Sequence, residues 1–339
     1  MFYSLGHYQK AEPLYIETLA LRKIILGDKH PNTFVSINNL GMLYFSQGLY
    51  DQAETLFITA LEQSREALGN KHANTLSSMN NLAVLYQAQK HYDKALTLQL
   101  ESLSLKKQFL GGKHRDTLIA MNNLASLYAL QGEYKKAELL FSETLVLKRQ
   151  LLGDKHPETL TSISNLAGVF ESQMEYKKAE PLFNEALTSS REVLGNQHPD
   201  TLTRMHYLAV LYINSQQWDK ADSLLTEHFE RSNQFLQQVL WEARETTRVS
   251  YITAEESNKN SYFNFYSMLN TASAAEKALN VSINRKGLLQ RLNHRWSDQQ
   301  LAGSVVEFPH KIDITQQNLR DKLTEHQVVI DYVIYRKGD

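Results

Sequence analysis

Five histidines recur 42 residues apart, and residues of this type could bind a metal ion or act as general bases. They are His30, His72, His114, His156 and His198. Ligands of one metal ion must converge within a few ångströms, whereas each of these histidines stands at the same place in a different repeat. The chain has no cysteine, which excludes thiolate ligands and a cysteine nucleophile. We therefore interpret the histidines as turn and capping residues, and we predict no catalytic residue, metal or cofactor.

The 42-residue period extends well beyond the histidines. A threonine follows each histidine by three residues, a Leu-Gly pair precedes it, and an alanine recurs later in each unit. These series are Thr33, Thr75, Thr117, Thr159 and Thr201; Gly27, Gly69, Gly111, Gly153 and Gly195; and Ala53, Ala95, Ala137, Ala179 and Ala221. Self-similarity at a fixed period of this length is typical of a solenoid, whose units bury their apolar faces only against neighbouring units.

Each unit is predicted to contain two helices. In residues 31–69, Pro31 suits the first turn of a helix over 32–47, Gly48 ends that helix, and Gly69 ends a second helix over 51–68. The small residues Gly41 and Ala53 are expected where the helices approach closely. The corresponding first helices are predicted at 74–89, 116–131, 158–173 and 200–215.

The order Leu40-Gly41-x-x-Tyr44, Gly48-x-Tyr50, Ala53, Phe57 and Ala60 resembles the tetratricopeptide repeat. The longer unit, with its L-G-[DN]-K-H-P-x-T-L signature, is similar to the kinesin light chain type. This resemblance implies an all-α fold, a right-handed superhelix, with five full units over about 31–238 and a half-unit before them in a 1–238 array. The implied function is a scaffold that binds a protein or peptide partner in a concave groove.

In the resembled family the first helix of each unit lines the groove, so its polar residues are candidate contacts. An asparagine amide can donate to and accept from a peptide backbone. Some of these amides could instead bond the next helix and hold the stack, and for the second asparagine of each pair we leave both roles open. The candidates are the pairs Asn38-Asn39, Asn80-Asn81 and Asn122-Asn123, the single Asn165 after Ser164, and Met42, Val84 and Ser126, with Phe45, Ala129 and Leu130 also facing inward. The fifth unit has His206-Tyr207 at this place, which indicates a change in the groove.

The repeat pattern ends after Trp218 and Ala221, and one long helix is predicted from 219 to about 252. Residues 239–326 are expected to form a helical linker region, in which aromatic residues such as Phe265 belong to a core. The β-branched run Val328–Tyr335 predicts a strand within 327–339. Residues 235–339, with Arg285-Lys286-Gly287-Leu288-Leu289 and this strand, resemble the region that enters a CHAT domain, which is caspase-like and mostly bacterial.

This second resemblance implies an alternative function, namely the sensor or regulatory portion of a CHAT peptidase. The His–Cys dyad of that family would lie downstream of the first strand, so this chain is not expected to be an enzyme by itself. A stand-alone hydrolase is disfavoured, because the chain lacks the HExxH, Walker and GxSxG motifs.

Composition and charge argue against two further classes of protein, those that bind nucleic acid and those that bind membranes. The formal net charge is −1, which gives no basic footprint for nucleic acid and no polybasic membrane patch. No apolar run approaches the roughly 18 residues of a membrane span, and the N-terminus does not resemble a signal peptide. We therefore expect a cytoplasmic protein with a protein partner. The pattern specifies neither the identity of that partner nor the oligomeric state.

Overall fold

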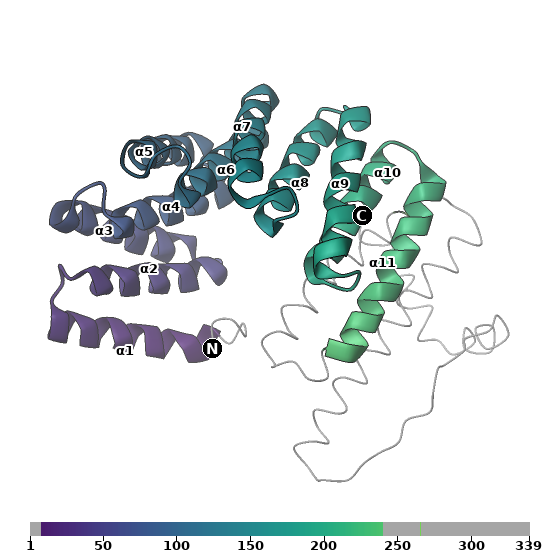
Figure 1. Cartoon of the computed structure of the whole chain (residues 1–339). Helices are drawn as coiled ribbons and strands as arrows, with labels where there is room; N and C mark the ends of the chain where they lie inside the picture. The colour runs from purple at the N-terminus through teal and green to yellow at the C-terminus, as the bar shows by residue number, and fades with distance from the viewer. Residues whose placement is uncertain (1–7, 240–264, 266–339) are drawn as a thin grey trace, which may run out of the picture. The chain divides into compact units, whose positions relative to one another are not determined.

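The computed structural model of the chain describes residues 8–239 and residue 265, and the described part is helical throughout (Figure 1). Its helices alternate between 16 residues and 19 or more. The shorter A helices are α2 (Pro31–Ser46), α4 (Ala73–Ala88), α6 (Arg115–Leu130), α8 (Pro157–Ser172) and α10 (Pro199–Asn214). The longer B helices are α1 (Tyr8–Leu26), α3 (Tyr50–Leu68), α5 (Tyr92–Leu110), α7 (Tyr134–Leu152), α9 (Tyr176–Leu194) and α11 (Trp218–Val239). The predicted first helices are confirmed to within one residue at each end.

The repeated histidine caps each A helix. In all five units its backbone is extended and its Nδ1 accepts a hydrogen bond from the backbone N–H two residues later. The N···N distance is 3.1 Å at His30 and 3.2 Å at His198. A side chain at this position satisfies one of the N–H groups that the first turn leaves unpaired. The capping interpretation of the histidines is therefore correct.

In the first three units, the repeated threonine and glycine hold the loop that joins a B helix to the next A helix. The hydroxyl of Thr75 donates to the carbonyl of Gly69 at 2.8 Å, and Thr117 repeats this bond to Gly111 at 2.9 Å. The glycines adopt φ near +85° with ψ near 165°, for example φ 83° and ψ 167° at Gly69. This region of backbone space is essentially restricted to glycine. The positive φ thus recurs at the glycine of all five units. The threonine bond does not, because Thr201 donates to the carbonyl of Ser190 and the Thr159 hydroxyl has no partner among the described residues.

Each A helix ends on a residue in the left-handed conformation. Gly48 and Gly132 have φ of 75° and 77°, while Lys90, Met174 and Gln216 hold the same place with φ near 60°. The following N–H closes the helix by bonding a carbonyl five residues back, as Glu175 does to Phe170 at 2.8 Å. This is the Schellman arrangement, which glycine favours because it lacks a Cβ.

Replacing Met174 by glycine is expected to raise the free energy of unfolding by about 1 kcal/mol, the cost of placing an L-residue in the left-handed region. The Met174 side chain is 76% exposed, so little packing is lost. Gly132→Ala, which makes the opposite change at the equivalent position, should lower stability by a similar amount. Urea unfolding followed by circular dichroism measures both. A lower midpoint for Met174→Gly would show that its side chain contributes more than its backbone costs.

Small residues set the distance between the A and B helices of a unit. Gly41 is buried, and a Cβ placed on it would lie 2.6 Å from Cε1 of Phe57 on α3. Alanine occupies the same position in the other units, and it is completely buried at Ala83, Ala125, Ala167 and Ala209. Large side chains from the B helix, such as Phe141 and Phe183, fill the space beside them. The core therefore continues from unit to unit along the array.

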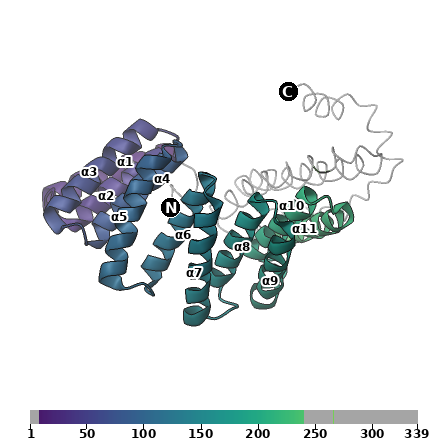
Figure 2. The same cartoon turned by 90° about the horizontal axis from the view of Figure 1, so that it is seen from above.

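Successive helices pack on each other in chain order, as an antiparallel row of pairs joined by short loops (Figure 2). Across units, the backbones of the A helices also meet, α2 with α4 and α6 with α8, more extensively than those of any two successive B helices in the described part. In these two pairs the A helices therefore lie closer together than successive B helices do. An array of this kind curves with its A helices on the inner side.

Ion pairs connect the B helices on the outer side. Arg65 on α3 pairs with Glu101 on α5 at 2.6 Å, and Arg191 on α9 pairs with Glu227 on α11 at 2.8 Å. These side chains are about one-third exposed. Pairs of this kind contribute roughly 0–1 kcal/mol each, so they help to align the helices more than they hold the array together.

The last described residues belong to the end of the array. The helix predicted over 219–252 is present as α11 up to Val239, and the rest of that prediction lies outside the described residues. Phe265 is fully buried, and its ring centroid lies 6.3 Å from that of Trp218. This agrees with a core role for Phe265. The other predicted features of 239–326 and 327–339, including the strand at Val328–Tyr335, also lie outside the described residues.

Candidate protein-binding groove

Every A helix leaves one face toward solvent, and the five faces together form what we call the inner strip. Four positions, spaced four, three and four residues apart, share this face because of the helical period. They are Val35, Asn39, Met42 and Ser46 on α2; Ser77, Asn81, Val84 and Ala88 on α4; Ile119, Asn123, Ser126 and Leu130 on α6; Thr161, Asn165, Gly168 and Ser172 on α8; and Thr203, Tyr207, Val210 and Asn214 on α10. All twenty are exposed or half-buried. Since the A helices lie on the inner side of the curve, the inner strip follows the concave face.

The first asparagine of each pair packs between neighbouring A helices. Asn38 is 6% exposed, and its Nδ2 donates to the hydroxyl of Ser78 at 2.8 Å. The second asparagine of the next unit reaches back to it, since Nδ2 of Asn81 donates to Oδ1 of Asn38 at 3.3 Å. Asn123 makes the same bond to Asn80 at 3.0 Å. Asn81 and Asn123 thus connect successive A helices, which is the role of holding the stack that we left open for the second asparagine.

Two asparagines of the inner strip are not used in this way. Asn39 is exposed and Asn165 is half-buried, and neither side chain hydrogen-bonds to another residue in the described part of the chain. Beside Asn165, Oδ1 of Asn122 is buried without a hydrogen-bond partner among the described residues. The bond that Asn123 makes to Asn80 is therefore not repeated by Asn165 and Asn122. The amides of Asn39 and Asn165 retain donors and acceptors for a bound molecule.

The remaining candidates fall on the inner strip or along its edge. Met42, Val84, Ser126 and Leu130 lie on the inner strip, and Leu130 is 52% exposed. Phe45 is half-buried at the edge, where its ring centroid lies 5.8 Å from that of Tyr50, and Ala129 is half-buried at the equivalent place. Sequence reasoning did not find the other members of the inner strip. Stepping four residues back and three and seven forward from each second asparagine, and from Tyr207 at the same place on α10, would have found them.

The inner strip itself contains no charged residue, and the nearest charged side chains lie beside it. Glu171 on α8 accepts a hydrogen bond from Nδ2 of Asn214 at 2.8 Å, and burial raises the pKa of this carboxyl. Arg204 is 5% exposed and donates to the carbonyl of Asp200 at 2.9 Å and to the hydroxyl of Thr161 at 3.3 Å. These two groups join α8 to α10 and are engaged within the stack.

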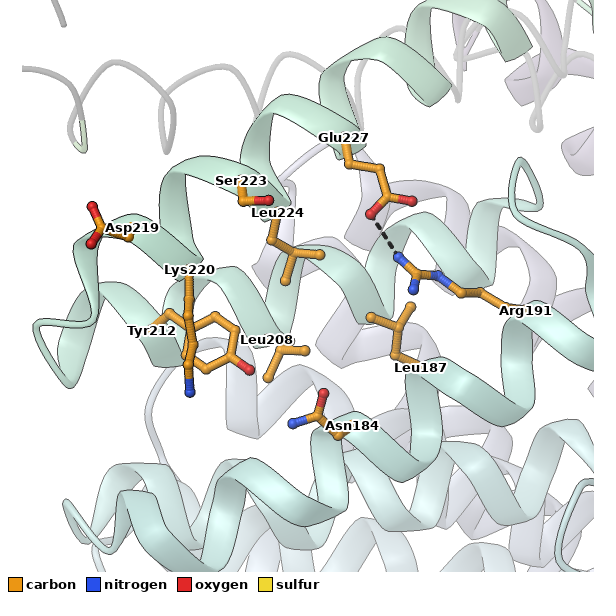
Figure 3. Close-up of a pocket in the computed structure, with 10 residues that line it drawn as sticks. All are labelled: Asn184, Leu187, Arg191, Leu208, Tyr212, Asp219, Lys220, Ser223, Leu224 and Glu227. Carbon is orange, nitrogen blue, oxygen red and sulfur yellow. Dashed lines mark hydrogen bonds and ion pairs between the residues drawn. The ribbon is translucent and has the colours of Figure 1, made fainter.

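An open pocket of about 410 Å³ lies between α9, α10 and α11, away from the inner strip (Figure 3). Arg191 and Glu227 pair across one side of it, and Lys220, which also lines it, pairs with Glu180 at 2.9 Å. Three of its charged groups, Arg191, Glu227 and Lys220, are thus engaged with each other or with the adjoining helix, and Asp219 lies at its edge. Within residues 8–239 and 265, no group of three or more potential metal ligands comes together.

Comparison with known proteins identifies the family to which the chain belongs. A model of the tetratricopeptide repeat matches it in five overlapping segments, residues 1–57, 34–108, 86–150, 116–192 and 158–234. The chain belongs to the tetratricopeptide repeat family. Such repeats generally mediate protein–protein interactions and are typically not catalytic. No curated protein sequence gives a significant match.

Solved structures share the fold of this tetratricopeptide array. The "kinesin light chain nearly identical TPR-like repeats" of Podosopora anserina match with a TM-score of 0.54 and 24% identity over 62% of this chain and 99% of theirs. BtubC (BKLC) from P. vanneervenii matches with a TM-score of 0.57 and 19% identity over 67% of this chain and 90% of its own. At this identity the likeness concerns the fold alone. No helix in the described part of the tetratricopeptide array is long and apolar enough to cross a membrane.

The fifth tetratricopeptide unit carries His206 where the first three units have an asparagine. Its imidazole is largely buried, and burial lowers its pKa below the usual value. Its ring centroid lies 6.0 Å from that of His228 on α11, which is fully buried. Protonation of His206 would place a charge in the interface between α10 and α11, where burial without a partner is costly.

Stability of the fifth unit is therefore expected to fall as the pH drops below the unfolded-state pKa of histidine, about 6.5. The folded state binds this proton less tightly, so the contribution of neutral His206 is complete above that value and is lost progressively toward the lower folded pKa. Melting temperatures measured between about pH 7.5 and pH 5 should decline less steeply for His206→Asn than for the parent chain. Parallel declines in the two proteins would exclude His206 as the source.

Proposed function

We propose that this tetratricopeptide array is a scaffold that binds a segment of a protein partner along the inner strip. The observation that carries the proposal is the column of asparagines formed by Asn39, Asn81, Asn123 and Asn165 on the exposed faces of four successive A helices. The amides of Asn39 and Asn165 form no hydrogen bond to the described residues, so their donors and acceptors remain available to a partner.

The spacing of this column suits a peptide main chain. Helices pack with their axes about 8–10 Å apart, while an extended chain advances about 3.3 Å per residue. Every third residue of an extended segment therefore comes opposite an asparagine. An amide offers one acceptor and two donors, so it can bond both the N–H and the C=O of that residue. Main-chain bonds of this kind give affinity, and neighbouring side chains then provide selectivity.

The proposal can be tested with a phage-displayed library of random 15-residue peptides as the probe and the full chain as the target. Peptides selected on the parent chain should bind the double variant Asn39→Ala/Asn165→Ala at least tenfold more weakly, while the melting temperature of that variant stays within a degree of the parent's. The stability should hold because these amides make no bond within the described part of the array.

A matched double variant separates binding from stacking. Asn81→Ala/Asn123→Ala removes the donors to Asn38 and Asn80, so it should lower stability by about 1 kcal/mol per lost bond and also weaken binding. If the selected peptides bind both double variants as tightly as the parent chain, the column is not the binding site and the proposal fails.

A second candidate function is regulation of a CHAT-type peptidase, in which the array would act as the sensor. It rests on the resemblance of residues 235–339 to the region that enters such a domain. The neighbouring reading frame should then encode an α/β domain with a His–Cys dyad, and selected peptides should change its cleavage rate in the presence of this chain. We also propose a bacterial source on the basis of this resemblance, and a cytoplasmic location on the basis of the composition.

A further inference from the structure

The inner strip carries no charged side chain. None of its twenty positions is Asp, Glu, Lys or Arg, although 22% of the chain is charged and about four charges would be expected among twenty positions at that rate. The exposed residues of the B helices include many charges, such as Glu62, Glu143 and Lys177. The absence of charge is therefore a property of the inner strip and not of the array as a whole.

A surface without charge disfavours a charged ligand. A segment that lies in the groove loses much of its water, and a carboxylate or ammonium group that is desolvated without an opposite charge costs several kcal/mol. Uncharged polar and apolar groups avoid this cost. Of the charges beside the inner strip, Glu171 is bonded to Asn214 and Arg204 is buried between α8 and α10. Arg115 pairs with Glu158, and the exposed Asp116 and Asp200 lie beyond the end of the strip, in the first turns of α6 and α10.

The inner strip also changes in character along its length. On α2, α4 and α6 the asparagines are flanked by apolar residues, among them Val35, Val84, Ile119 and Leu130. On α8 the neighbours of Asn165 are Thr161, Gly168 and Ser172. Apolar side chains of a ligand would bury favourable surface over the first three A helices, whereas small or polar ones fit over the fourth.

We infer that the inner strip takes an extended, charge-free segment of about nine residues from a protein partner, with its apolar side chains over α2 to α6. The length follows from three intervals of about 10 Å between four asparagines, divided by about 3.3 Å per extended residue. This inference deepens the proposed function and rests on it, because it specifies the chemistry of the segment that the asparagine column binds.

The test uses opposite charges introduced at one central position, with the library-selected peptides as probes. Ser126 lies on the inner strip of α6, flanked by Asn122 and Asn123. Both Ser126→Lys and Ser126→Asp should weaken binding at least fivefold. The same charges at the exposed Ser104 of α5 serve as controls and should have no effect. Affinity should also vary less than about twofold between roughly 0.05 and 0.5 M NaCl, because few charges take part.

Other outcomes show whether this inference alone is wrong or whether the proposed function is wrong as well. If one sign of charge at Ser126 weakens binding and the other strengthens it, or if the selected peptides are rich in charged residues, the ligand is charged and this inference fails while the proposed function stands. If neither the Ser126 variants nor the asparagine variants change the affinity for the selected peptides, the proposed function fails as well. If the chain self-associates and the Ser126 variants abolish this, a second copy occupies the inner strip and the inference of a separate partner is wrong.

Discussion

Replacing Leu124 by alanine is expected to lower the free energy of unfolding by about 2–5 kcal/mol, the usual range for a buried leucine. Leu124 is 3% exposed and belongs to a cluster with Leu118 and Met121 of the same helix and Leu103 of α5. Alanine would leave a cavity between α5 and α6 beside these side chains. The loss therefore combines the transfer of the side chain with unfilled volume.

Leu139→Ala on α7 provides the matched control, because it makes the same chemical change at a side chain that is 73% exposed. Urea unfolding of both variants, followed by circular dichroism, measures the two effects on one scale. A shift for Leu124→Ala no larger than that for Leu139→Ala would mean that the side chain does not lie in the core.

Gly153→Ala should lower the free energy of unfolding by about 1–3 kcal/mol through the backbone alone. Gly153 has φ 89° and ψ 165°, a region that alanine reaches only with strain. A Cβ added there would meet no atom within 4 Å, so a steric clash with a neighbouring residue cannot account for the loss. The loop between α7 and α8 must either distort or carry this strain.

Gly112→Ala is the control for this prediction. Gly112 also has open space around a potential Cβ, and it lacks the positive φ of its neighbour Gly111. Alanine at Gly112 should be neutral or slightly stabilising, since it reduces the freedom of the unfolded chain. Equal losses at Gly153 and Gly112 would indicate that loop flexibility, and not the conformation of one residue, limits stability.

The repeat units and their helices could be predicted from sequence, because each boundary is determined by residues close to it in the chain. His72 caps a helix that begins at the next residue, and Gly69 fixes the loop before it. Such local rules act identically in every unit, so a period in the sequence translates directly into a period in the structure. The helix ends accordingly lie within one residue of their predicted places.

The roles of the individual asparagines could not be predicted in the same way. Asn81 bonds Asn38 because α2 and α4 are packed in a particular register, and residue spacing within a helix does not specify that register. The break at Asn122 and Asn165 depends on the relation of α6 to α8 for the same reason. Sequence left the binding and stacking roles open, and the hydrogen bonds now separate Asn39 and Asn165 from Asn81 and Asn123.

The bonds between units span fixed separations along the chain. Asparagines of successive A helices bond over 43 residues, and arginine–glutamate pairs of successive B helices form over 36. Both separations follow from the 42-residue period, and each recurs wherever the two residue types are present and paired. Duplication or deletion of 42 residues in the gene would therefore rejoin the same kinds of partners at the new junction. Evolution can in this way lengthen or shorten the protein by whole units, and with it the reach of its inner surface, while the same kinds of contact form between units.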